Sequence, residues 1–345
     1  MNKYLQEHDA RRDRGHMNQE PRAFLALLAQ DPNSNLLTLI IWHFLHARGS
    51  LSRLCLTSRA LNQASCDFFE VYPWRIGTAT SDGSFRVQAS NLRRLPNTFA
   101  SHVRVPGDLL VVGNTRMHTL PANFGHAQVG GAIHMYNNRL RALPASIGRL
   151  EIKADLWLND NRLRALPDSF CELVVGGSVS LHRNRLRSLP DDFGRLRVKR
   201  NLYLQDNQLQ ALPEGFGRLK LLGDLWLNSN QLRLLPQDFC DLEVGGSIFL
   251  QDNLLESLPE RFGDIRVKRN LYLHGNRLRT LPQSFPNIRV GWNLYLHSNR
   301  LDTLPEGFCH IAVNGNLFLP YCLKAAFSAA QFPNVAAQVM FVPEP

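Results

Sequence analysis

Apolar and polar residues alternate in short runs that recur along most of the chain. The run at residues 156–161, Leu-Trp-Leu-Asn-Asp-Asn, is representative. Its alternation is typical of a β-strand, in which successive side chains point to opposite faces. We predict that Leu156 and Leu158 point into the core, so that Trp157 and Asn159 point outward.

A Leu-Pro-x-x-Phe or Leu-Pro-x-x-Ile pentad follows each run, and from Pro121 onward these prolines lie 23 residues apart. Proline fixes φ and removes a main-chain donor, which suits a turn without a strand partner. An asparagine ends each predicted strand, where its amide can pair main-chain groups as the chain turns. The prolines are Pro96, Pro121, Pro144, Pro167, Pro190, Pro213, Pro236, Pro259, Pro282 and Pro305, and the asparagines are Asn114, Asn138, Asn161, Asn184, Asn207, Asn230, Asn253, Asn276 and Asn299.

Residues 85–322 therefore resemble the leucine-rich repeat family, whose signature is L-x-L-x-x-N at a fixed period of 20 to 29 residues. The resemblance implies a solenoid of about ten 23-residue coils with a parallel sheet on its concave face. After each Phe the chain reads L-x-V, as at Leu173 and Val175. That period of two predicts extended or turn-like backbone, with few or no helices, on the convex side. Residues 323–345 should cap the last coil.

Residues 21–80 show helical spacing instead, so the predicted fold class is α+β. The segment 36–45 is apolar on nearly all sides and predicts a buried helix, and Leu51, Leu54 and Leu61 recur at helical spacing. Three short helices could simply cap the first coil. Residues 1–20 are predicted to be a disordered tail that could hold a secretion signal.

The helical region also resembles an F-box, although Asp31 stands where that pattern has leucine and the acidic residue after the proline is missing. The matching residues are Pro32, Leu36, Leu37, Ile40, Ile41, Leu51, Leu54, Leu56, Ser58 and Arg59. In that family these helices dock on the Skp-type adaptor of a cullin-RING ubiquitin ligase, and attached leucine-rich repeats select the substrate. Effectors of plant-pathogenic bacteria combine the same two parts.

The outward position at the centre of each strand is aromatic in seven of eight successive coils. These residues are Trp157, Tyr203, Trp226, Phe249, Tyr272, Tyr295 and Phe318, and Ser180 interrupts them. A contiguous exposed aromatic strip favours a protein-binding site, because aromatic residues are preferred interface anchors. Stacking along the strip could instead serve the fold alone.

Polar residues are predicted to flank the strip on both sides, as at the rim of an interface. One flank holds Asp155, Asn201, Asp224, Asn270 and Asn293, and the other holds Asn159, His182, Gln205, Asn228, Gln251, His274 and His297. His274 and His297 should be neighbours, but two imidazoles without a third ligand are a weak metal signal. We therefore expect no metal and no cofactor.

The net charge of +10 lies almost wholly in the repeats. Arginines follow the asparagine column at Arg139, Arg162, Arg185, Arg277 and Arg300, and again two residues later at Arg141, Arg164, Arg187, Arg233 and Arg279. They could form a solubilising rim, or attract an acidic partner surface, nucleic acid or an anionic membrane. No groove-reading motif supports nucleic acid.

Cys171, Cys240 and Cys309 recur every three coils. At about 4.8 Å per coil they would lie about 14 Å apart, too far for disulfides. Free thiols fit a reducing cytosol. The first thirty residues lack the apolar segment of a secretory signal peptide, and no apolar run is long enough to span a bilayer.

No nucleophile with a neighbouring base, phosphate-binding glycine loop or paired carboxylates stands out, so the sequence predicts no enzyme. We interpret the chain as a protein-recognition module: a type III secreted effector in the host cytoplasm, with the nucleus as a further destination, acting as substrate receptor of a host ubiquitin ligase. The alternative is a stand-alone leucine-rich repeat effector or scaffold that binds a partner without recruiting a ligase.

Overall fold

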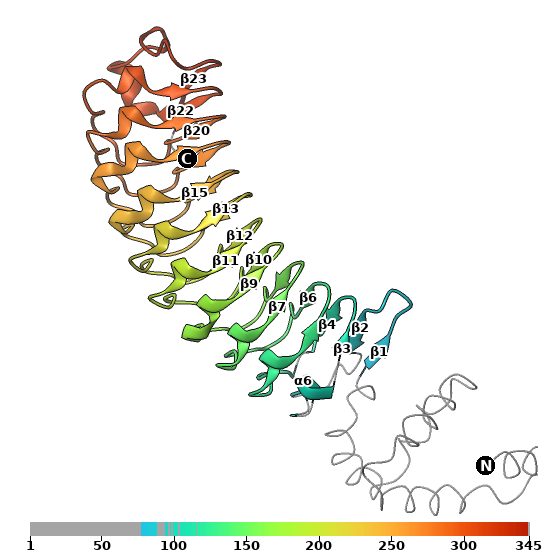
Figure 1. Ribbon diagram of the computed structural model, residues 1–345. Helices are drawn as coiled ribbons and strands as arrows, with labels where there is room; N and C mark the ends of the chain where they lie inside the picture. The colour runs from blue at the N-terminus through green and yellow to red at the C-terminus, as the bar shows by residue number, and fades with distance from the viewer. Residues whose placement is uncertain are drawn as a thin grey trace, which may run out of the picture. The chain divides into compact units, whose positions relative to one another are not determined.

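The computed structural model describes residues 77–87, 94–95, 97, 99–102, 104–114 and 116–343. In this part the coils stack side by side along one axis, and each contributes one strand to a long sheet (Figure 1). The F-box-like residues between Pro32 and Arg59, the tail at 1–20 and nearly all of the predicted helical region lie outside the described residues.

The long sheet has 13 strands, and β1 and β2 form an antiparallel hairpin at one end while all later neighbours are parallel. Its strands are β1 (Gly77–Ala79), β2 (Phe85–Val87), β4 (Leu109–Leu110), β6 (Ile133–His134), β8 (Leu156–Trp157), β10 (Val179–Ser180), β12 (Leu202–Tyr203), β14 (Leu225–Trp226), β16 (Ile248–Phe249), β18 (Leu271–Tyr272), β20 (Leu294–Tyr295), β22 (Leu317–Pro320) and β23 (Val339–Val342). The register pairs each residue with its equivalent in the next coil, as Tyr203 with Trp226. Equivalent residues therefore form columns.

The C-terminal boundary of the predicted helical range 21–80 needs a correction. Its last residues include β1, which is a strand of the hairpin. Asp82 and Gly83 make the turn between β1 and β2, with Gly83 at φ +80° and its N–H bonded to the Thr80 carbonyl at 3.0 Å. Asp-Gly is a strong hairpin signal because glycine tolerates positive φ.

The opposite side of the coils carries 3-10 turns and short extended segments. The turns are η2 (Phe124–His126), η3 (Ile147–Arg149), η4 (Asp168–Glu172), η5 (Phe193–Arg195), η6 (Phe216–Arg218), η7 (Gln237–Asp241), η8 (Glu260–Asp264), η9 (Phe285–Asn287) and η10 (Phe308–His310). The strands form small parallel sheets: β3 (Arg104–Val105) and β5 (Gln128–Val129); β7 (Glu151–Ile152), β9 (Val174–Val175) and β11 (Arg197–Val198); and β13 (Lys220–Leu221), β15 (Glu243–Val244), β17 (Arg266–Val267), β19 (Arg289–Val290) and β21 (Ala312–Val313). Among the described residues the single α-helix is α6 (Phe99–His102), so the expectation of few helices on this side is confirmed there.

The core lies between these two sides. Leu156 and Leu158 are fully buried and Trp157 is partly exposed, which confirms the predicted strand phase. Asn159, which was also predicted to face outward, is instead buried, at 8% exposure. A column of buried phenylalanines stacks beneath the 3-10 turns with centroids 5.9–6.5 Å apart from Phe170 to Phe308. Rings on the sheet side are closer, 4.4–4.5 Å from Phe249 to Phe318. The coils therefore fan apart on the 3-10 side, which puts the sheet on the inner, concave side.

The asparagine column forms the predicted ladder, as Asn207 illustrates. Its Nδ2 donates to the carbonyls of Leu181 at 3.0 Å and Leu204 at 3.1 Å, and its Oδ1 accepts the N–H of Leu186 at 3.0 Å. Equivalent bonds recur from Asn161 to Asn299, whereas Asn138 Oδ1 instead accepts the N–H of Asn114 at 2.8 Å. These bonds join each coil to the one before it and satisfy main-chain groups inside the turn.

The C-terminal segment closes the stack partly by continuing it. After η11 (Tyr321–Ala325) and η12 (Ala329–Gln331), β23 adds a parallel strand beside β22. Phe332 is buried, and Phe327 and Phe341 pack against the core.

Candidate functional site

The aromatic residues of the sheet project outward, as the strand phase requires. Trp157, Tyr203, Trp226, Phe249, Tyr272, Tyr295 and Phe318 are each partly exposed, whereas the leucines or isoleucine before them in the strands are fully buried. We call these seven residues the aromatic column. It lies on the concave side, where a partner can reach several coils at once.

The column is tightly stacked in its C-terminal half. Ring centroids are 3.6 Å apart between Trp226 and Phe249 and 4.5 Å apart between Tyr272 and Tyr295, with interplanar angles of 13° and 10°. Because each ring covers part of its neighbour, the column presents ring edges and partial faces. Stacking and exposure therefore occur together, and one does not exclude the other.

The N-terminal half is looser because Ser180 occupies the place of a ring. Trp157 and Tyr203 lean over it from either side, with centroids 6.3 Å apart, and Ser180 is fully buried. His134 extends the column by stacking on Trp157 at 6.5 Å. The sequence analysis missed His134, although its register opposite Trp157 could have identified it.

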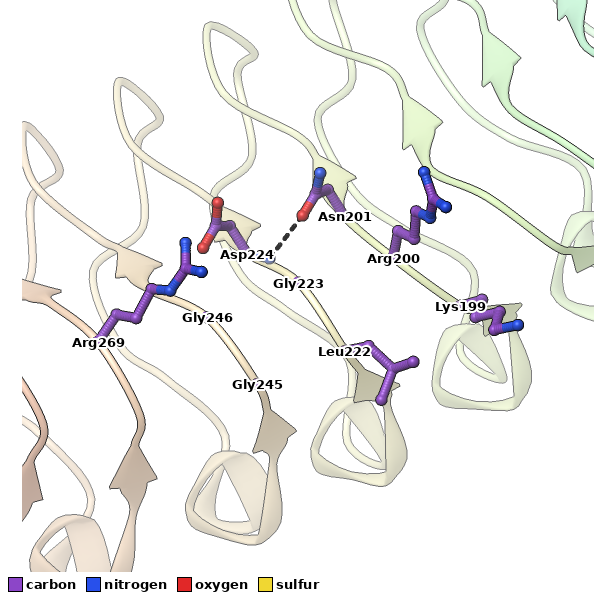
Figure 2. A pocket seen from close by; sticks show the side chains of 9 residues that line it. All are labelled: Lys199, Arg200, Asn201, Leu222, Gly223, Asp224, Gly245, Gly246 and Arg269. Atoms are coloured by element: carbon purple, nitrogen blue, oxygen red, sulfur yellow. Dashed lines mark hydrogen bonds between the residues drawn. The ribbon is translucent and has the colours of Figure 1, made fainter.

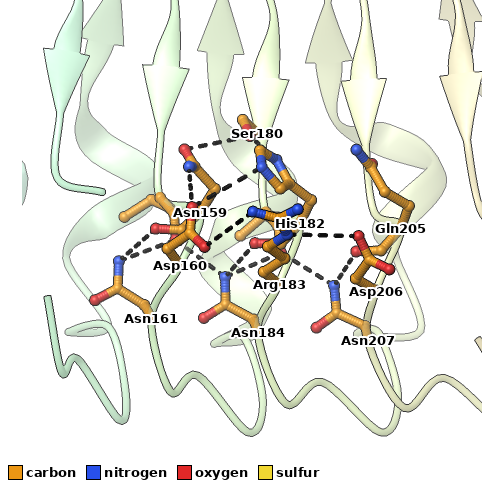
Figure 3. A network of polar contacts seen from close by, with 12 residues as sticks. Asn159, Asp160, Asn161, Ser180, His182, Arg183, Asn184, Gln205, Asp206 and Asn207 are labelled. Atoms are coloured by element: carbon orange, nitrogen blue, oxygen red, sulfur yellow. Dashed lines mark hydrogen bonds and ion pairs between the residues drawn. The ribbon is translucent and has the colours of Figure 1, made fainter. Parts of the chain in front are cut away.

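Polar residues after the strands form one flank of the column (Figure 3). Ser180 Oγ lies 2.7 Å from His182 Nδ1, and Asn159 Nδ2 donates to Asp160 Oδ2 at 2.7 Å. Farther along, several buried polar atoms have no hydrogen-bond partner within the described chain: Gln205 Oε1, Asn228 Oδ1, Gln251 Oε1, His274 Nδ1, His297 Nδ1 and Trp226 Nε1. Buried polar groups are normally paired. These atoms have almost no accessible surface, so a partner can bond them only after their side chains turn outward.

The histidines of this flank favour their neutral form. His274 and His297 stack with centroids 4.7 Å apart at 10°. Burial lowers the pKa of both, and the neighbouring His274 lowers the pKa of His297 further. Burial also lowers the pKa of His182. Within the described residues, no group of three or more His, Cys, Asp or Glu side chains is arranged to hold a metal ion.

The other polar flank has a structural role that the sequence analysis did not foresee. Asn201 Oδ1 accepts the N–H of Asp224 at 2.7 Å, and Asp224 Oδ1 accepts the N–H of Ser247 at 2.7 Å. We call this column the edge ladder; its members include Asp155, Ser178, Asn201, Asp224, Ser247, Asn270 and Asn293. Its side chains connect successive coils, so they are less free to serve as an interface rim than their outward position suggested.

The arginines beside the asparagine ladder are mostly exposed, and none of the ten that the sequence analysis named pairs with an acidic group of the described chain. Arg183 is different, since its guanidinium lies 3.8 Å from both Asp160 and Asp206. The positive charge of Arg183 is therefore partly neutralised by these two carboxylates.

The cysteines of the repeats are free thiols, as predicted. Burial raises the pKa of Cys171 and of Cys240 to about 11, so these thiols are protonated at neutral pH and suit packing rather than nucleophilic chemistry. None of the helices in the described part of the chain has the length and apolar character needed to cross a membrane.

Comparison with known proteins found similarity to solved structures of leucine-rich repeat proteins. No family model matches the sequence, and no curated protein matches it. A leucine-rich repeat protein of Leptospira interrogans is 21% identical over 72% of this chain and 77% of that chain, with a TM-score of 0.43. YopM, a leucine-rich effector protein from Yersinia pestis, is 24% identical over 69% of this chain and 61% of its own, with a TM-score of 0.47. A leucine-rich repeat protein from Bacteroides eggerthii is 15% identical over 73% and 51%, with a TM-score of 0.49. These similarities concern the leucine-rich repeat fold alone.

Proposed function

We propose that this leucine-rich repeat protein binds another protein through the aromatic column on its concave face. The observation that carries the proposal is the unbroken run of partly exposed rings from Tyr203 to Phe318, set on strands whose other side is fully buried. Aromatic side chains bury large areas at small entropic cost and dominate binding energy at interfaces. The flank from Gln205 to His297 places partly exposed polar side chains beside them.

We further propose that residues 31–75 dock on a Skp-type adaptor, so that the protein acts as substrate receptor of a host cullin-RING ligase after delivery into the host cytoplasm as a type III effector. This part rests on the F-box-like sequence. If the adaptor does not bind, the protein is a stand-alone recognition module that masks or scaffolds its partner.

Site-specific photo-cross-linking tests the concave face. p-Benzoylphenylalanine is placed at Phe249 in the column or, as a control, at Val174 on the opposite side, which is 49% exposed. In host lysate we expect a discrete adduct from position 249 that the double variant Tyr203→Ala/Trp226→Ala abolishes and Leu234→Ala, a change at another exposed residue, preserves. Equal adducts from both positions would contradict binding through the column.

Co-purification tests the ligase proposal separately. The full chain should retain a purified Skp-type adaptor, and Leu54→Asp should release it while the circular dichroism spectrum stays unchanged. Tyr203→Ala/Trp226→Ala should leave adaptor binding intact. Failure of the wild-type chain to bind the adaptor would favour the stand-alone module and leave the concave-face proposal standing.

A further inference from the structure

A strongly basic surface lies on the edge of the stack where the chain passes from the outer strands to the main sheet. Two coils, three apart, each present three exposed cations: Arg197, Lys199 and Arg200 in one, and Arg266, Lys268 and Arg269 in the other. None of the six pairs with an acidic group of the described residues. Their charge is therefore available to a ligand.

The two coils between these clusters leave a shallow groove (Figure 2). The groove encloses about 450 Å³, and its floor includes Gly223, Gly245 and Gly246, with Leu222 beside them at 71% exposure. Lys199 and Arg200 lie at one end and Arg269 lies at the other. The arrangement combines cationic ends with a glycine floor, one large apolar side chain, Leu222, and one carboxylate, Asp224.

The edge ladder leaves little space beside the glycines of the groove floor. A Cβ at Gly223 would lie 1.9 Å from Asn201 Oδ1, and a Cβ at Gly246 would lie 2.1 Å from Asp224 Oδ1, so glycine fits best at both places in this geometry. The ladder residues before the two arginines are serines, whose side chains are shorter: Ser178 precedes Arg200 and Ser247 precedes Arg269. Trp292 follows Asn270 at the equivalent position, so a ladder asparagine does not by itself demand glycine.

Aromatic and apolar groups distinguish this edge from a purely electrostatic surface. Trp292 is 52% exposed, and the Arg269 guanidinium lies 5.3 Å from its ring centroid. With Leu222, this gives the basic edge two large apolar contacts that a peptide side chain can cover. A nucleic-acid base could stack on Trp292, but the aliphatic side chain of Leu222 offers no ring on which a base can stack. The combination therefore favours a protein ligand over a nucleic acid.

We propose that this groove binds an extended acidic segment of a protein, with carboxylates at its two ends and an apolar residue between them. Coils are about 4.8 Å apart, so the two cation clusters are about 14 Å apart. An extended chain advances about 3.4 Å per residue and places every second side chain on one face. The matching ligand therefore has acidic residues about four positions apart, and the residue midway between them faces the floor near Leu222.

Asp224 is the one acid that lines the groove. Its Oδ1 accepts the N–H of Ser247 at 2.7 Å, a contact that asparagine makes at the equivalent positions of Asn201 and Asn270. Asp224→Asn should therefore keep the ladder and remove a negative charge that opposes the ligand. The wild-type groove should therefore bind the acidic segment more weakly than the Asp224→Asn variant does. This variant tests the proposal through an increase in affinity.

The experiment measures fluorescence anisotropy of labelled peptides with the full chain at about 0.15 M salt. One peptide has two glutamates four residues apart around a central leucine, and a second of the same composition has the glutamates adjacent. We expect the spaced peptide to bind at least tenfold more tightly. Arg200→Gln/Arg269→Gln should weaken it at least tenfold, and Asp224→Asn should strengthen it severalfold.

The matched control is Arg164→Gln/Arg233→Gln, which removes two exposed arginines, also three coils apart, from the edge beside the asparagine ladder. It should change affinity less than twofold, as should Tyr203→Ala/Trp226→Ala, so that this result is independent of the concave-face proposal. Equal losses of peptide affinity in the two double-arginine variants would show that binding depends only on overall positive charge, which would overturn the proposal. Indifference to glutamate spacing, or tighter binding of a single-stranded oligonucleotide that the peptide cannot displace, would overturn it as well.

Discussion

The inward and outward sides of the same strands differ in how much they vary from coil to coil. Inward, an apolar residue recurs at each position, and from Asn161 to Asn299 the ladder repeats the same hydrogen bonds. Outward, the equivalent positions hold histidine, tryptophan, serine, tyrosine or phenylalanine, and several buried polar atoms beside them have no partner in the described chain. Close packing in the core therefore fixes the type of each inward residue, whereas the outward positions vary even though the edge ladder and the aromatic column also join neighbouring coils.

The outward side itself divides into two halves. From Trp226 to Phe318 the rings stack with centroids no more than 4.5 Å apart, whereas around Ser180 they are about 6 Å apart. The tightly stacked half combines stability with a continuous surface. The looser half has rings that can adjust to a partner at smaller cost to the fold.

The largest effect should come from the inward side. Phe216 is fully buried and stacks on Phe193 and Phe239 with centroids 6.0 and 6.1 Å away. Phe216→Ala should lower the free energy of unfolding by about 3–5 kcal/mol, because it removes apolar burial and leaves a cavity. Urea denaturation would measure it against Val174→Ala at an exposed site, where a change within about 0.5 kcal/mol is expected. Similar losses of unfolding free energy in Phe216→Ala and Val174→Ala would contradict the difference between buried and exposed positions.

The asparagine ladder should show the next effect. Asn207→Ala leaves the N–H of Leu186 and the carbonyls of Leu181 and Leu204 without their side-chain partner. A buried unsatisfied group costs about 1–3 kcal/mol, so we expect a loss of about 2–3 kcal/mol. Gln210→Ala, an exposed change in the same coil, is the control for urea denaturation. A loss under about 0.5 kcal/mol would show that the ladder adds little to stability.

Two tyrosines of the aromatic column sharpen the division between its halves. Tyr272 has rings 4.5 Å away on both sides, whereas the rings beside Tyr203 are 6.3 and 5.9 Å away. Aromatic pairs contribute about 0.5–1.5 kcal/mol beyond burial, so Tyr272→Ala should cost about 1 kcal/mol more than Tyr203→Ala in thermal or urea unfolding. Equal costs would mean that the closer stacking has no energetic consequence.

The smallest effect should be a pH dependence at the polar flank. Burial lowers the pKa of His274 and of His297 in the folded chain, so the unfolded chain takes up protons first as the pH falls. Stability should therefore decrease below about pH 6.5, the ordinary histidine value. Between pH 7.5 and pH 5.5 the melting temperature of the wild type should fall further than that of His274→Gln/His297→Gln, because the variant lacks these two titrating groups. A constant difference across this range would contradict the shift.

Much of the fold and part of the candidate site could be predicted from the sequence. The 23-residue period, the inward leucines and the asparagine ladder were readable because each depends on alternation within one strand and on repetition between coils. The hairpin of β1 and β2 was also within reach through its Asp82-Gly83 turn, but β1 lay at the end of the range 21–80 that was predicted to be helical. His134 was missed although it shares the register of Trp157.

The side of each strand that faces the core can be read from the sequence, because alternation along a strand is a local property of the backbone. The contacts between neighbouring coils become visible only in the folded stack: Trp157 and Tyr203 meet over Ser180, Asn201 and Asp224 bond the next coil, and two cation clusters border one groove. Distance is the cause. Side chains one to three coils apart interact only when the stacking geometry brings them within a few ångströms, and that geometry is a property of the whole stack.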